Sequence, residues 1–258
     1  MALTPTFDNF SLQDSNYITT EVDVRTPPNR EFQMETVSRK PGKKLLAAEF
    51  AERRMKLAGY IIADSNAQLI TLIDDFHDNI TRKKSGTFSV DTDREILATV
   101  ASVSVPTPHY SQSMTSFDME LVAADPFFLG PQQTVSWTVT SGTASLSYTL
   151  TVSGSVFAEP TIVYTAPGTS GSTTTSGIII SYDPTAETTT WSGGNHTLAY
   201  GNFVKFDFQN LLVYEGSNKV EPAGLFPRWE PGSTTFTTTW SGTCQGGSLD
   251  LIYRPRYL

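Results

Sequence analysis

Apolar and polar residues alternate along most of the 258-residue chain, and a helical repeat replaces this alternation in one segment. Between residues 63 and 80, apolar side chains recur at steps of three and four, which indicates an amphipathic helix with one buried face. Asp64 or Ser65 can cap its N-terminus. The apolar positions are Leu69, Leu72, Ile73, Phe76 and Ile80.

The segments on either side of this helix follow a period of two, which is typical of half-buried strands. Before the helix the alternating positions are Met55, Leu57, Gly59 and Ile61, and after it they are Phe88, Val90, Ile96, Val100, Val103 and Val105. The first half therefore reads as a mixture of strands with one main helix. Residues 43–56 are ambiguous, because Leu45 to Arg54 is rich in strong helix formers. We expect a loop or a short helix there, followed by a strand.

The second half is predicted to be almost entirely β. Residues 134–156 alternate around a turn at Ser141, Gly142 and Thr143. Glycine, proline, serine and asparagine clusters separate the later strands, a spacing typical of a β-sandwich. These strands are expected at residues 161–164, 178–180, 203–208, 236–240 and 249–253, with an exposed loop at 169–176. Phe236 and Trp240 share parity and should face the core together, whereas Trp229 could lie in the core or at the rim.

Composition changes near Leu129. Residues 1–129 contain 31 charged residues and residues 130–258 contain 13, while all four tryptophans lie in the second part. Proline and glycine interrupt the chain at Pro126, Gly130 and Pro131. We therefore expect two domains, residues 1–129 and residues 130–258.

The net charge of −8 argues against a surface that binds duplex nucleic acid or anionic lipid. Arg82, Lys83 and Lys84 form one basic cluster, which is either a DNA contact or a solvated helix end. The longest apolar runs are far shorter than the ~20 residues of a membrane-spanning helix. The N-terminus has neither a basic leader nor an apolar stretch, so no signal peptide or membrane anchor is expected.

Few residues suggest catalysis. The single cysteine, Cys244, excludes an internal disulfide and a cysteine-based zinc cluster. Residues 242–246 have the spacing of a nucleophile elbow, but a strand rather than a helix is expected to follow, which favours a turn cysteine. The other candidates are His77, His109 and His196 in separate segments, and an Asp91-Thr92-Asp93 sequence that lacks the remaining ligands of a calcium loop and reads as a hairpin turn. We expect no enzyme activity, no cofactor and no metal.

One cluster could bind a ligand. Trp191, Asn195 and His196 lie around a tight turn at a strand end, where an aromatic platform beside amide and imidazole groups would suit a carbohydrate. The alternative is a hairpin whose tryptophan packs into the sandwich.

Several segments, in order, resemble the distal tail proteins, or Dit, of long-tailed bacteriophages. In the first half they include Phe7-Asp8-Asn9-Phe10, the stretch from Arg53 to Ile61 ahead of the helix, and an ending at Asp125-Pro126-Phe127-Phe128. In the second half they are residues 152–162, 206–208, 215–217, 226–233 and 252–258. Together these segments span nearly the whole chain.

The resemblance implies a mainly β protein with an N-terminal α+β ring-forming domain and one main helix, residues 1–129, followed by a galectin-like β-sandwich, residues 130–258. It implies a hexameric ring at the distal end of the tail, within the virion, with an axial channel for DNA. The implied partners are other copies of the chain, the tail tube protein, the baseplate hub or tail tip protein, and side fibres or host surface glycans. No sequence-specific nucleic acid binding is implied. The alternative function is a carbohydrate- or receptor-binding baseplate module that acts through the second domain.

Overall fold

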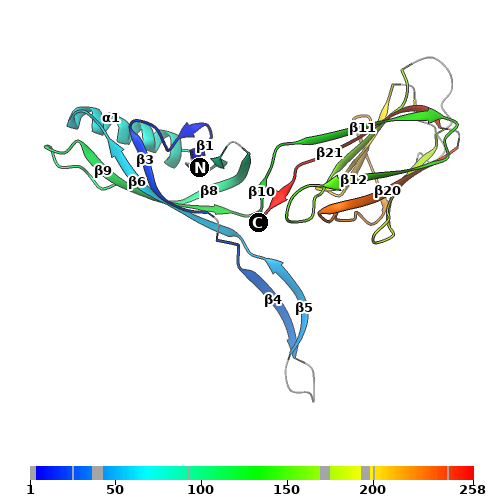
Figure 1. The fold of residues 1–258 in the computed structure, drawn as a ribbon, viewed down its shortest axis with the longest axis horizontal. Coiled ribbons are helices and arrows are strands. Elements are labelled where there is room, and N and C mark those ends of the chain that lie inside the picture. Colours follow the sequence, from blue (N-terminus) through cyan, green and yellow to red (C-terminus); the bar gives the residue numbers. More distant parts are fainter. Residues whose placement is uncertain are drawn as a thin grey trace. The chain divides into compact units, whose positions relative to one another are not determined.

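A computed structural model describes residues 4–24, 26–36, 43–91, 93–168, 175–192, 198–199, 201–242 and 244–258. The chain divides into two compact units, Met1–Leu129 with Leu258, and Gly130–Tyr257 (Figure 1). Strands dominate both units, so the predicted mainly β fold is confirmed. None of the described helices is long and apolar enough to cross a membrane.

The first unit is built on one antiparallel sheet with the strand order β2-β1-β7-β8-β9-β6-β3. Its strands are β1 (Thr6–Phe7), β2 (Phe10–Ser11), β3 (Tyr17–Asp23), β6 (Arg53–Ile62), β7 (Ser85–Asp91), β8 (Arg94–Ser104) and β9 (Met114–Ala123). The short strand β10 (Phe128–Leu129) pairs with β8 through Leu129 and Glu95. Strand β3 is at one end of this order, so one of its backbone edges is unpaired within the described sheet.

Helix α1 (Asn66–Phe76) packs against β6 and β9, and a single π-helical turn (His77–Thr81) follows it (Figure 1). Leu69 and Phe76 are buried, and the Phe76 ring centroid lies 5.0 Å from that of Phe117 on β9. The Ser65 side chain accepts a hydrogen bond from the Gln68 backbone N–H, so the predicted cap is confirmed. The helix begins three residues later than the pattern predicted.

The expectation for residues 43–56 is wrong. Strand β4 (Arg30–Thr36) pairs with β5 (Lys43–Phe50) in a separate two-stranded antiparallel sheet, and β6 begins at Arg53 (Figure 1). The β5 backbone has its hydrogen-bond partners in β4, and this pairing overrides the weak local preference for a helix.

The second unit is a β-sandwich of two antiparallel sheets, with the strand orders β11-β21-β13-β16-β17-β18 and β12-β20-β14-β15-β19 (Figure 1). The first sheet contains β11 (Gln133–Ser141), β13 (Thr161–Thr165), β16 (Phe203–Asp207), β17 (Leu212–Glu215), β18 (Asn218–Val220) and β21 (Gln245–Tyr253). The second contains β12 (Ser145–Val152), β14 (Gly177–Tyr182), β15 (Glu187–Ser192), β19 (Ala223–Gly224) and β20 (Gly232–Ser241). The last strand, β22 (Arg256–Tyr257), forms bridges from Arg256 to Gly154 and Val156.

Aromatic side chains from both sheets fill this core. The ring centroids of Tyr164 on β13 and Trp240 on β20 lie 5.8 Å apart, and those of Trp137 and Tyr148 lie 4.6 Å apart. Phe236 and Trp240 are both buried on the inner face of β20, as predicted, and Trp229 is in the core. Each predicted strand of this half coincides with an observed one.

Tyr148 contributes a buried phenol to this core, with only 8% of its surface exposed and no hydrogen-bond partner among the described residues. Burial raises the pKa of Tyr148 to about 12, from an ordinary value of about 10. Because the folded state holds this proton more tightly than the unfolded state, the stabilisation is complete below about pH 10. It is lost as the pH rises through 12.

We therefore expect Tyr148→Phe to flatten the fall in stability between pH 10 and pH 12. At pH 8 the variant should be as stable as the wild type or more stable, because it no longer buries an unpaired hydroxyl group. Urea unfolding at a series of pH values measures this, with Tyr110→Phe, at an exposed phenol, as the control. Equal pH slopes for the Tyr148→Phe variant and the wild type would contradict the assignment.

Candidate assembly surface

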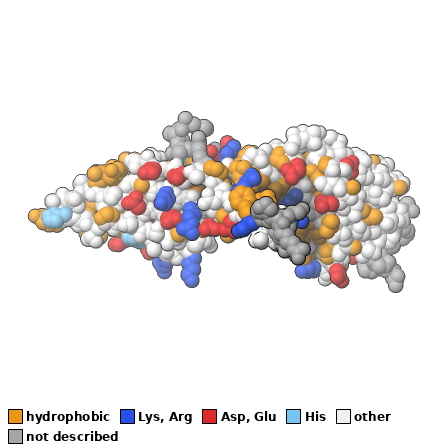
Figure 2. Space-filling model, turned by 90° about the horizontal axis from the view of Figure 1, so that it is seen from below, with side chains coloured by type: hydrophobic (Ala, Val, Ile, Leu, Met, Phe, Trp, Pro, Cys, Tyr) orange, Lys and Arg blue, Asp and Glu red, His pale blue; other side chains and the backbone are white. Residues whose placement is uncertain are grey.

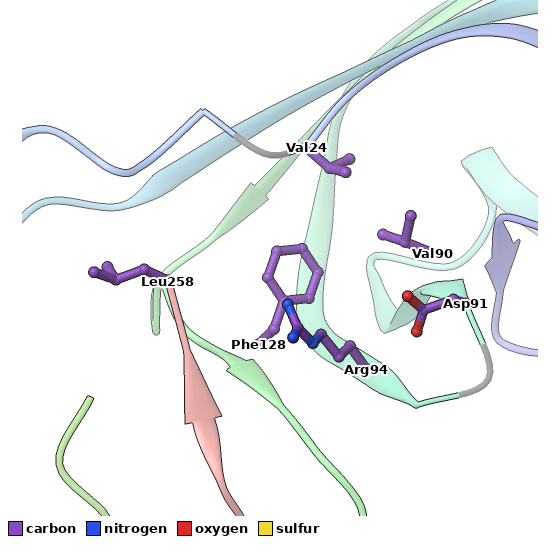
Figure 3. A pocket seen from close by; sticks show the side chains of 6 residues that line it. All are labelled: Val24, Val90, Asp91, Arg94, Phe128 and Leu258. Atoms are coloured by element: carbon purple, nitrogen blue, oxygen red, sulfur yellow. The ribbon is translucent and has the colours of Figure 1, made fainter. Parts of the chain in front are cut away.

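A pocket of about 390 Å³ in the first unit is lined mainly by apolar side chains. Figure 3 shows Arg94 extending beside the Phe128 ring, with Asp91 close by on the preceding strand. Val24, Val90 and Leu258 complete the lining. Asp91 and Arg94 are paired at the end of the β7–β8 hairpin, where the sequence predicted a polar turn.

The cysteine and the histidine that the sequence singled out as candidate catalytic residues lie in packed or locally hydrogen-bonded positions. Cys244 is fully buried between β20 and β21, and Tyr164 donates a hydrogen bond to the Gly246 carbonyl oxygen at 2.6 Å beside it. The turn-cysteine interpretation is confirmed. His77 Nδ1 lies 3.0 Å from Thr81 Oγ1 within the π-helical turn. Among the described residues, no cluster of histidine, cysteine, aspartate and glutamate could hold a metal ion.

Two members of the basic cluster have acidic neighbours. Lys83 Nζ lies 3.5 Å from Asp8 Oδ2, and Arg82 Nη1 lies 3.7 Å from Asp78 Oδ1. These contacts favour the solvated helix end over the DNA contact. Exposed pairs of this kind add little to stability.

The predicted carbohydrate site is not supported at Trp191. This side chain is 1% exposed and belongs to the sandwich core, where it pairs with Ile178 across β14 and β15. A buried indole has no free face on which a sugar ring could stack, so the alternative of a core tryptophan fits the structure. Asn195 and His196 lie outside the described residues, and their binding role stays a prediction.

We expect Trp191→Phe to lower the free energy of unfolding of the second unit by about 2 kcal/mol, because it leaves a gap in a packed core. The half-buried Trp137 supplies the matched variant, Trp137→Phe, with a smaller expected loss. Chemical denaturation followed by tryptophan fluorescence measures both changes. Unchanged stability together with lost binding on a glycan array would instead restore the sugar-stacking interpretation.

A buried arginine fixes the base of the β4–β5 hairpin. Arg53 is 1% exposed, and its Nε donates to the Pro126 carbonyl oxygen at 2.7 Å. Its Nη1 donates to the carbonyl oxygens of Val24 at 2.8 Å and Thr26 at 3.3 Å. The guanidinium carbon also lies 5.0 Å from the centroid of the Phe128 ring. Arg53 therefore joins the segment that enters the hairpin to the segment that precedes β10.

Both strands of the β4–β5 hairpin expose large apolar side chains. Every residue of β4 is exposed, and Phe32, Met34, Leu45 and Leu46 are each more than half exposed. The register pairs Phe32 with Ala48 and Met34 with Leu45, which places these four side chains on one face. We call them the hairpin surface. The register shifts between Gln33 and Met34, so Leu46 has no partner in the β4–β5 ladder. In Figure 2 the hairpin points towards the viewer, and hydrophobic side chains gather there with basic ones.

A second exposed apolar patch lies on the main sheet, on the face opposite α1. Ile18 pairs with Tyr60, and Ile62 pairs with Met114. Tyr60 is 41% exposed and Met114 is 48% exposed. We call these four residues the sheet surface. A groove of about 290 Å³ lies around Ala58, two residues before Tyr60 on β6. It is lined by Glu21, Lys56, Leu57, Ala58, Ser102, Ser104, Asp118, Met119 and Glu120.

Sequence reasoning missed both surfaces. The alternation of Glu31, Phe32, Gln33, Met34 and Glu35 is a strand pattern that could have revealed β4. The sheet surface could not be recognised from the sequence, because Tyr60 and Ile62 are apolar like the buried residues of β6 that precede and separate them.

These observations define a two-unit, mainly β chain whose prominent exposed features are apolar surfaces suited to assembly. No protein-family model matches the chain, and no curated protein sequence matches it. Among solved structures, the Dit protein (gp 19.1) of phage SPP1, described as a paradigm of the hub adsorption apparatus in phages that infect Gram-positive bacteria, matches over 100% of both chains. The TM-score is 0.75 and the sequence identity is 15%.

Two chains from the phage P2 baseplate in its activated conformation are more distant. The calcium form covers 98% of this chain and 97% of that one, with 8% identity and a TM-score of 0.49. The strontium form covers 96% and 97%, with 9% identity and a TM-score of 0.47. The chain thus has the fold of the SPP1 Dit protein, and the predicted resemblance to the Dit family is confirmed at the level of the fold.

Proposed function

We propose that this protein is a structural component of a phage tail tip. Copies of the chain form a ring, hexameric as the family resemblance implies, that connects the tail tube to the baseplate hub and leaves a channel for DNA. The observation that carries the proposal is the likeness in fold to the SPP1 Dit protein over the full length of both chains.

The first unit has features that a ring requires. Strand β3 is at the edge of its sheet, and both strands of the β4–β5 sheet have unpaired outer edges within the described part of the chain. Unpaired strand edges readily accept another chain. A contact between two different surfaces repeats from copy to copy, and it closes into a ring when the rotation per copy divides a full turn.

The net charge of −8 also supports a conduit for DNA, because a channel that held phosphate groups tightly would slow their passage. The side fibres, host glycans and tube and hub partners implied by the resemblance stay predictions. No reaction is proposed for this chain.

Native mass spectrometry and negative-stain microscopy of the purified full-length chain test the proposal. The expected result is a closed ring of identical copies, together with antibody labelling at the distal end of tails in phage particles that contain this protein. A chain that stays monomeric at high concentration and labels no tail would refute it.

A further inference from the structure

The β4–β5 hairpin lacks the support that a two-stranded sheet needs. An isolated hairpin of this size is marginally stable in water unless a further layer packs on it. Here β4 is exposed along its whole length, and Glu31 stands directly opposite Glu49 on the face away from the hairpin surface. Two like charges in that position cost stability. A partner that covers the hairpin surface would supply the missing burial.

The register shows what such a partner would meet. Phe32, Met34 and Leu45 form the apolar centre of the face. Lys43 pairs with Thr36 beyond this centre, and Arg30 pairs with Phe50 before it, so a cation flanks the apolar residues at each end. The fitting counterpart is an apolar patch with carboxylates beside it.

The same chain carries that counterpart. On the sheet surface, Tyr60 and Ile62 succeed Ala58 on one face of β6, and the charged residues that line the groove around Ala58 are Glu21, Lys56, Asp118 and Glu120. Arg54 Nη1 lies 3.5 Å from Glu120 Oε1, so Glu21 and Asp118 supply the remaining negative charge. From Ala58 to Ile62 is four residues, about 13 Å in a strand.

The hairpin has the same spacing, because Thr36, the partner of Lys43, is also four residues from Phe32. One arrangement therefore places Lys43 over the carboxylates, Met34 and Leu45 over Tyr60, and Phe32 over Ile62.

We propose that the hairpin surface docks on the sheet surface of a second copy of this chain, with Lys43 seated at the acidic groove. The proposal deepens the proposed function, because it rests on self-association and names the two surfaces that meet.

A second copy fits better than the hairpin's own sheet. The hairpin leaves the sheet beyond Asp23 and Arg53, whereas Tyr60 lies seven residues further along β6, about 23 Å away in a strand. Folding back would require a reversal at residues 24–29, where the carbonyl oxygens of Val24 and Thr26 are held by Arg53. A contact between unlike surfaces is heterologous, so it propagates from copy to copy.

Cysteine cross-linking between differently tagged full-length chains tests the contact. One chain carries Leu45→Cys and the other Tyr60→Cys, and the two are co-expressed and then oxidised. The native Cys244 is buried and should not react. We expect a disulfide-linked dimer that contains one chain of each tag. The matched control replaces Leu45→Cys with Glu31→Cys, on the opposite face of the hairpin, and should give at least tenfold less product.

Each other outcome has a defined meaning. A dimer formed only between two Leu45→Cys chains would overturn the sheet surface as the receiving site. A link formed only within one chain that carries both substitutions would overturn docking on a second copy. A ring that forms without any of these links would overturn this inference and leave the proposed function intact, whereas a persistent monomer would refute both.

The charges provide an independent readout. Lys43→Glu should raise the concentration at which the assembly dissociates at least tenfold, and Glu21→Lys in the same chain should recover most of that loss. Met34→Ser should weaken assembly similarly, while Gln33→Ser, on the other face, should leave it within twofold of the wild type. Equal effects of Met34→Ser and Gln33→Ser in analytical ultracentrifugation would contradict the proposal.

Discussion

Arg53→Ala is expected to destabilise the first unit by about 3–5 kcal/mol, since it removes a buried guanidinium from three carbonyl oxygens. Those oxygens belong to Val24, Thr26 and Pro126. The side chain also packs against Phe128, so the substitution leaves a cavity. The base of the β4–β5 hairpin should loosen first.

The positions of the tryptophans allow the unfolding of the two units to be followed separately. Trp137, Trp191, Trp229 and Trp240 all belong to the second unit. During urea unfolding, hydrogen exchange of the α1 amides should therefore shift to lower denaturant, while the tryptophan fluorescence transition should stay in place.

Arg54→Ala is the matched control, because the neighbouring Arg54 is exposed and its ion pairs with Glu52 and Glu120 are at the surface. We expect a change of less than about 0.5 kcal/mol there. If both arginine variants had the same small effect, the structural role assigned to Arg53 would be wrong.

Gly59→Ala is expected to cost about 3 kcal/mol or to prevent the first unit from folding, because there is no room for a side chain at this position in β6. An added Cβ would overlap the carbonyl oxygen of Ile18 on β3 and lie 2.7 Å from the Phe117 ring. The ring could move, but the carbonyl belongs to the paired backbone of β3.

Gly168→Ala is the comparison for this variant, since among the described residues beyond its chain neighbours no atom lies within 4 Å of the added Cβ at that position. It should leave the melting temperature nearly unchanged. Circular dichroism of both variants measures the difference, and a Gly59→Ala protein as stable as the Gly168→Ala protein would contradict the tight approach of β3 to β6.

Local periodicity was enough to predict the elements that bury one regular face. Helix α1 was predicted from Leu69, Phe76 and their neighbours, and β20 from the spacing of Phe236 and Trp240. The β4–β5 hairpin was not predicted, because residues 45–54 prefer a helix locally and only the pairing with β4 decides their conformation. Trp191 could not be placed either, because the same strand-end sequence suits a core or a surface indole.

The candidate assembly surface was beyond prediction for a different reason. An exposed Phe32 or Tyr60 looks the same in the sequence as a buried one, and only the register shows which side chains share a face. The resemblance to the Dit family predicted a ring but did not say which surfaces join its copies.

The facing carboxylates of Glu31 and Glu49 have a consequence for how newly made chains behave in a crowded cell. Their mutual repulsion discourages another sheet from stacking on the face of the hairpin that carries Glu31 and Glu49. In the described register, the hairpin surface on the opposite side has no facing carboxylates, so this repulsion acts on one side of the ribbon only. The hairpin thus gives up some stability of its own and gains control over how it associates.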